Sequence, residues 1–171
     1  MLLAAAALLL SGCGSGELAP EPDGWGVETG PLAVGTEEYF GLPTLQVTGS
    51  APVHVLAVQV PDVPSGLRIA GTYAVSLTES GDGESGDYLT NAAADFMRQH
   101  EPKFRVHPVT DAVLRPGPEY SDWYLLIDAV PTRVGTFAIT GLRVLYESGG
   151  SFHTATFGGW RLVVDCSRSS A

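Results

Sequence analysis

The sequence predicts an all-β domain, folded as a sandwich of antiparallel strands. Hydrophobic residues make up 44% of the 171-residue chain, and charged residues only 16%. The 21 glycines and 12 prolines supply many turns. From Thr44 onward, short apolar runs recur between turn residues, which is the spacing expected of a sandwich or barrel. A chain of this length suits one domain with one core.

The first two strands expected in this domain differ in their patterns. Residues Val53 to Val60 are apolar apart from His54 and Gln59, which predicts a central strand buried on both faces. Residues 67 to 77 alternate between apolar and more polar side chains, which predicts a strand with one buried face.

One short helix is expected between the strands. The Gly-, Ser- and acid-rich residues 79–87 predict an exposed loop. After it, Thr90 or Asn91 can cap a helix that runs through Gln99 and is stopped by Pro102.

The C-terminal half returns to strands. Residues 104–109 and 123–130 predict two of them, separated by a Pro- and Gly-rich turn at 114–118. Farther on, the apolar phase shifts by one residue at Thr140-Gly141, which predicts a β-bulge at Gly141. The residues in the two phases are Phe137 and Ile139, then Leu142, Val144 and Tyr146.

A hairpin should close the domain. The loop Glu147–Ser151 leads onto a strand at 152–157, which Gly158-Gly159 interrupts before the run that ends at Cys166.

The N-terminus carries a targeting pattern. Residues 1–10 are only Met, Ala and Leu, which is long enough for the apolar part of a signal peptide but too short to span a bilayer. They run into Leu10-Ser11-Gly12-Cys13, which resembles the lipobox of bacterial lipoproteins. Eight of the nine basic residues are Arg, as is typical of GC-rich genomes, so the resemblance is to lipoproteins of the high-GC Gram-positive type.

This resemblance implies a cellular location and a domain organisation. Residues 1–12 would be a signal peptide, and a lipidated Cys13 would anchor the chain to the extracytoplasmic face of the cell membrane. Residues 13–24 read as a flexible Gly/Ser/Pro tether, 25–166 as the sandwich domain and 167–171 as a disordered tail.

A second resemblance runs from the Leu114-Arg115-Pro116-Gly117 turn to the Gly141–Tyr146 strand. With Pro131-Thr132 and Gly135-Thr136-Phe137 between them, these look like the closing strands of bacterial immunoglobulin-like modules. The resemblance implies an immunoglobulin-like β-sandwich that serves in adhesion, spacing or protein recognition.

The charge balance limits the partners. With 19 acidic and 9 basic side chains the formal net charge is −10, so the field of the protein repels phosphate backbones. Nucleic acid is therefore not expected as a partner.

Two places could bind or react. A lipidated Cys13 would leave Cys166 as a reduced thiol, and its phase places it in the core, with an intermolecular disulfide or a metal as alternatives. In the acidic loop, Asp82, Glu84 and Asp87, with Glu79 nearby, could form a weak Ca²⁺ site, although a solvated loop is the simpler interpretation. The four histidines, at positions 54, 100, 107 and 153, show no metal-binding spacing.

No catalytic pattern is recognisable. The sequence has no nucleophile elbow, P-loop or dinucleotide fingerprint. The aromatics Trp25, Tyr39, Phe40 and Tyr120 could form a recognition patch or cap the ends of the core. We therefore expect a non-enzymatic binding or spacing module of the cell envelope without a cofactor, which meets an envelope protein; the alternative is a small-ligand or metal-ion carrier.

Overall fold

The computed structural model describes residues 18–20, 26–28, 31–76, 105–117 and 122–166. These residues form strands and a single 3-10 turn. The strands are β1 (Leu18–Pro20), β2 (Gly26–Glu28), β3 (Glu38–Gly41), β4 (Leu45–Val47), β5 (Val53–Gln59), β6 (Leu67–Ser76), β7 (Val106–Pro108), β8 (Val113–Leu114), β9 (Trp123–Pro131), β10 (Gly135–Ser148) and β11 (Ser151–Cys166). The turn is η2 (Val109–Asp111). The expected helix lies outside the described residues.

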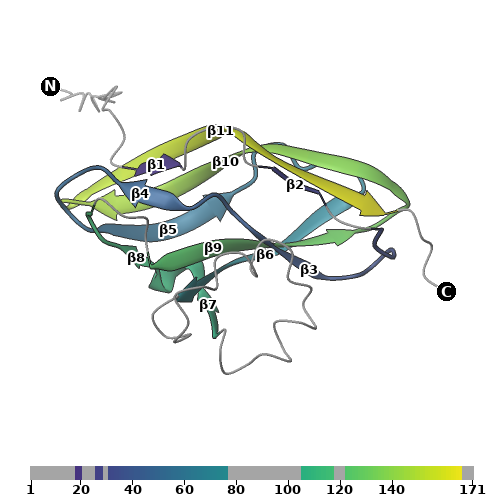
Figure 1. Cartoon of the computed structure of the whole chain (residues 1–171), viewed down its shortest axis with the longest axis horizontal. Coiled ribbons are helices and arrows are strands. Elements are labelled where there is room, and N and C mark those ends of the chain that lie inside the picture. Colours follow the sequence, from purple (N-terminus) through teal and green to yellow (C-terminus); the bar gives the residue numbers. More distant parts are fainter. Residues whose placement is uncertain (1–17, 21–25, 29–30, 77–104, 118–121, 167–171) are drawn as a thin grey trace, which may run out of the picture.

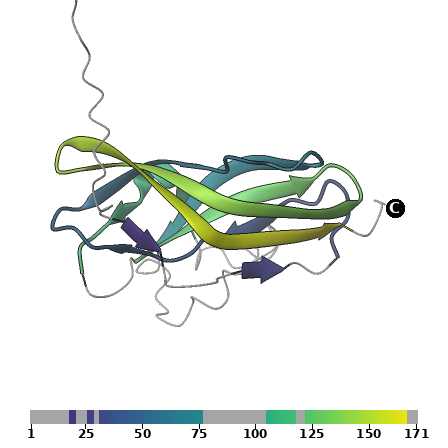
Figure 2. The same ribbon diagram turned by 90° about the horizontal axis from the view of Figure 1, so that it is seen from above.

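Two sheets face each other as a sandwich (Figures 1 and 2). One has the order β2-β11-β10-β5-β8 and the other β3-β9-β6-β7, while β1 and β4 form a separate pair. Neighbouring strands are antiparallel except that β2 runs parallel to β11. The neighbours β5-β10-β11 and β3-β9-β6 have the order of strands C-F-G and B-E-D in immunoglobulin sandwiches. The expected all-β antiparallel sandwich is confirmed.

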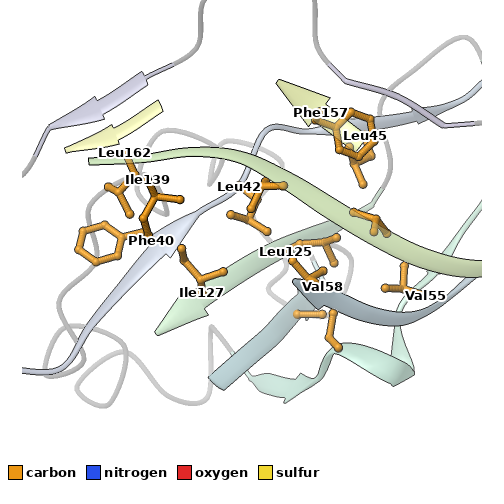
Figure 3. Close-up of a cluster of buried hydrophobic side chains, with 14 of the residues drawn as sticks. Phe40, Leu42, Leu45, Val55, Val58, Leu125, Ile127, Ile139, Phe157 and Leu162 are labelled. Atoms are coloured by element: carbon orange, nitrogen blue, oxygen red, sulfur yellow. The ribbon is translucent and has the colours of Figure 1, made fainter. Parts of the chain in front are cut away.

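The core lies between the two sheets. Phe40 and Ile127 from the four-stranded sheet meet Ile139 and Leu162 from the five-stranded sheet (Figure 3), and none of the four is exposed. Burial of such apolar side chains, at about 25 cal/mol per Å², is the main force that holds the layers together.

The long β10–β11 hairpin confirms the predicted hairpin and the predicted bulge, with a turn shorter than the expected loop 147–151. Its turn consists of Gly149 and Gly150 alone, and both have positive φ, as the tightest hairpin turns require. Farther along, the register shifts between Thr140 and Leu142, so the predicted irregularity at Gly141 is present. Figure 2 shows the hairpin bending along its length.

The interruption predicted at Gly158-Gly159 is present in the pairing of β11 with β10 but not in the strand itself. Strand β11 continues through both glycines, but three of its residues, 158–160, face the single residue Gly141 on β10. The ladder therefore opens for a short stretch while the strand runs on.

The prediction of a two-sided strand at Val53–Val60 is wrong. Strand β5 alternates between buried and exposed residues, because its outer face is open. The strand buried on both faces is β9, where every residue after Trp123 is buried. It lies between β3 and β6, and its residues Tyr124 and Leu126 belong to a second apolar cluster on the outer face of that sheet.

Strand β6 also differs from its predicted pattern. Its register against β9 shifts between Ile69 and Gly71. Before the shift, Leu67 and Ile69 pack into the main core; after it, Tyr73 and Val75 belong to the outer cluster. One unbroken apolar face is therefore not present.

The folded domain begins earlier than expected. Leu18–Pro20, placed in the flexible tether by the sequence analysis, pairs with β4, and Leu18 is buried in the core. The tether expected over 13–24 is thus interrupted by a strand. The expected signal peptide, Cys13 and the tail 167–171 lie outside the described residues.

Candidate recognition surface

The outer faces of the two sheets are unlike. On the four-stranded sheet, Val75, Tyr124 and Leu126 form a buried cluster against which Tyr39, Tyr73 and Val106 pack. On the five-stranded sheet, the outward residues near the hairpin turn are exposed or half-buried. The second face is therefore the one on which the described chain leaves side chains accessible.

We call the accessible part of this sheet the hairpin face. It consists of His54 and Leu56 on β5, Glu147 on β10, and Phe152, Thr154 and Thr156 on β11.

Phe152 dominates the hairpin face. It is the second residue after the turn and is 79% exposed, more than any other large hydrophobic side chain described. Glu147 lies opposite Phe152 on one side and opposite His54 on the other, so the three form a cross-strand row. Aromatic residues are enriched at protein interfaces, where their rings supply large, rigid contact area.

Leu56 adds a second apolar side chain. The register between β10 and β5 shifts where Leu145 faces Ala57 and Tyr146 faces Val55, so Leu56 is the extra residue of a bulge. It is 39% exposed. Leu56 therefore faces outward like His54, and the bulge returns Val58, the next buried residue, to the inner face.

The hairpin face rests on a packed base. On the inner side of the same strands, Tyr146 is 1% exposed and its ring stacks on His153 with centroids 5.3 Å apart. Ser148, beside the turn, is also buried. Phe152 is thus presented by strands whose opposite face is fixed in the core.

Cys166, a sequence candidate, lies at the far end of β11 and is fully buried, as its phase predicted. Burial, and secondarily the Asp165 carboxylate, raises the pKa of its thiol. Because the thiolate is the reactive form, this position favours an inert core thiol.

Two buried carboxyl groups were missed by the sequence analysis. Burial raises the pKa of Glu38 to about 7. Burial, and then the Glu37 carboxylate, raises the pKa of Asp128, while Arg68 lowers it. Since Glu38 is paired with Ala129 and Asp128 with Tyr39, the two side chains point to opposite faces of one sheet. They cannot act together on one substrate.

The remaining sequence candidates are not brought together. His54, His107 and His153 lie on β5, β7 and β11, and within the described ranges no group of three His, Cys, Asp or Glu side chains could hold a metal ion. Phe40 is a core residue and Tyr39 is half-buried, so neither belongs to the hairpin face. Cys13, Trp25, His100, Tyr120 and the acidic residues 79, 82, 84 and 87 lie outside the described residues.

The sequence did contain a signal for Phe152. Phe152 and Phe157 are five residues apart, so on a regular strand they must face opposite sides. Ala155 and Phe157 are buried, which leaves Phe152 on the outer face. Leu56 shares the phase of His54 and so faces the same side, but within an apolar run this alternation gives only a weak signal.

Comparisons with known proteins do not identify a family. No protein-family model matches the chain, and neither does any curated protein. Among solved structures, the chain is similar to one titled "Structure of Vibrio cholerae VesB protease", with 9% identity and a TM-score of 0.40. The match covers 87% of this chain and 32% of that chain, so this chain spans about a third of that protein. A likeness this distant carries no argument about activity. Within the described ranges, no helix has the length and apolar character needed to cross a membrane.

Proposed function

We propose that this chain is a lipid-anchored binding or spacing module of the cell envelope, with no enzymatic activity of its own, that contacts an envelope protein through the hairpin face. The observation that carries the proposal is the 79% exposure of Phe152 on strands whose inner face is buried. An exposed aromatic ring on a rigid support loses little conformational entropy on binding, which is what an interface anchor requires.

The extracytoplasmic address is part of the proposal and is supported by the sequence. The apolar run 1–10 and the Leu10-Ser11-Gly12-Cys13 pattern resemble a lipoprotein signal. Anchoring through more than one acyl chain gives stable membrane attachment, whereas a single chain holds only weakly.

Metabolic labelling with a tagged fatty acid tests the anchor. The wild-type chain should be labelled in its host, and a Cys13→Ala variant should not. A Cys13→Ala variant that is still labelled would refute lipidation at this position.

A crosslinking pulldown from intact cells tests the binding surface. The wild-type chain should recover a specific envelope protein, and Phe152→Ser should lose it. Val134→Ser is the matched control, because Val134 is also an exposed apolar residue, at 53%, but precedes β10 at the other end of the hairpin. If Phe152→Ser and the wild-type chain recovered the envelope protein equally well, the hairpin face would not be its binding surface. Stoichiometric metal in the purified protein would instead favour a carrier.

A further inference from the structure

We propose that a second copy of this chain adds to the free edge of β11, with Ser151–Phe157 of the two copies pairing antiparallel about a two-fold axis at Thr154. The inference rests on the proposed function, because the same hairpin carries the binding surface and the dimer contact. It proposes a second copy of the chain as one partner of that hairpin.

Strand β11 has an open edge near the hairpin turn. In the five-stranded sheet, β11 has β10 on one side and β2 on the other. Strand β2 pairs only with Arg161–Val163. Along Ser151–Phe157, no strand among the described residues pairs with the side of β11 that faces away from β10. Such an edge presents backbone donors and acceptors to another chain.

The backbone N–H and C=O groups of alternate residues of β11 point toward this open edge. Because Gly149 and Gly150 alone form the turn, the Ser148 carbonyl accepts from the Ser151 N–H, and the two residues form a hydrogen-bonded pair. Hydrogen-bonded and non-hydrogen-bonded pairs alternate along an antiparallel ladder. The backbone groups of Phe152, Thr154 and Thr156 therefore point away from β10, toward the open edge.

The open edge of β11 is complementary to a second copy of itself. These three residues are symmetric about Thr154, so a two-fold axis there pairs Phe152 with Thr156 of the second copy and Thr154 with its own counterpart. Each of the three pairs can exchange two backbone hydrogen bonds. Aromatic with β-branched, and Thr with Thr, are favourable cross-strand pairs. The pairing would also cover part of the exposed Phe152 ring.

The charge distribution also favours contact between two copies at this edge. Two copies that each carry a net charge of −10 repel one another over most of their surface. No Asp, Glu, Lys or Arg occurs between Ser148 and Trp160, so this edge brings no like charges together. It also lacks the Lys or Pro with which natural edge strands block such pairing.

The test exploits the axis. A soluble chain with Cys13→Ser should be a dimer by analytical ultracentrifugation. Thr154→Lys places two ammonium groups opposite each other and should give a monomer, as should Thr154→Glu with two carboxylates. Mixing the Lys and Glu variants should give a mixed dimer, because position 154 of one copy lies opposite position 154 of the other and the two charges then attract. Thr136→Lys is the control, an exposed threonine on β10 beyond the bulge, and should leave the dimer intact.

Hydrogen exchange of the unsubstituted chain gives a readout that needs no variant at position 154. The amides of 152, 154 and 156 should be protected at high and exposed at low protein concentration, while those of 153 and 155 stay protected throughout. A monomer at every accessible concentration, or a dimer that Thr154→Lys leaves intact, would overturn the inference. Recovery of an envelope protein by a monomeric chain would leave the proposed function standing without this inference.

Discussion

Gly141 lies so close to Phe157 that a β-carbon on the glycine would be 3.1 Å from the Phe157 carbonyl oxygen. Gly141 also has a φ of +86°, in the region that L side chains rarely adopt. These two constraints explain why a glycine stands where the β10–β11 ladder changes register.

Gly141→Ala should therefore destabilise the domain by about 1–3 kcal/mol, since both the backbone conformation and the close backbone oxygen oppose a side chain. Denaturant unfolding measures the change. Gly158→Ala is the matched control in the same irregularity, because a β-carbon there meets nothing within 4 Å, and it should cost far less. Equal losses for the two variants would show that the bulge geometry is wrong.

The buried Glu38 carboxyl should make stability depend on pH. Its pKa rises from an ordinary value of 4.5 to about 7 through burial, so the folded state disfavours the charged form. Stability contributed by the neutral form is fully present below pH 4.5 and is lost as the pH rises to about 7, by about 3 kcal/mol in all. Asp128, whose pKa is also raised, acts in the same direction.

Glu38→Gln isolates this contribution. The variant should be more stable than the wild-type chain at pH 8 and close to it at pH 4, as measured by denaturant unfolding at both values. A variant that is less stable at pH 8 would mean that the Glu38 carboxylate has a favourable partner.

The Cys166 thiol should react slowly in the folded state. It is fully buried and its pKa is raised, so both access and thiolate formation are suppressed. In a Cys13→Ser chain, a thiol reagent should modify Cys166 at a negligible rate until denaturant is added. Immediate modification of the native protein would contradict its position in the core.

Much of the fold follows from local pattern, and the exceptions have physical causes. The phase change at Gly141 and the Gly149-Gly150 turn were predictable because both depend on glycine and on period-two alternation. The errors at β5 and β6 arose from tertiary contacts: whether a strand is covered on one face or two depends on what packs over it. Bulges at Leu56 and between Ile69 and Gly71 then change which face the later residues of each strand occupy, without a mark in the sequence.

The candidate site was less predictable than the fold. Glu38 and Asp128 look like ordinary surface acids in the sequence, and only the pairing of β3 with β9 buries them. The β5 residues of the hairpin face lie about ninety to a hundred positions before those of β10 and β11, so no local pattern could assemble the face.

The central claim is that the outward side of the β10–β11 hairpin near its turn is the contact surface. Photo-crosslinking residues placed one at a time in the anchored chain, in intact cells, test it most directly. Adducts are expected from positions 152, 154 and 156 and none from 136, 138 and 140, which are also exposed and lie on the far half of β10. Adducts confined to the far half would contradict it.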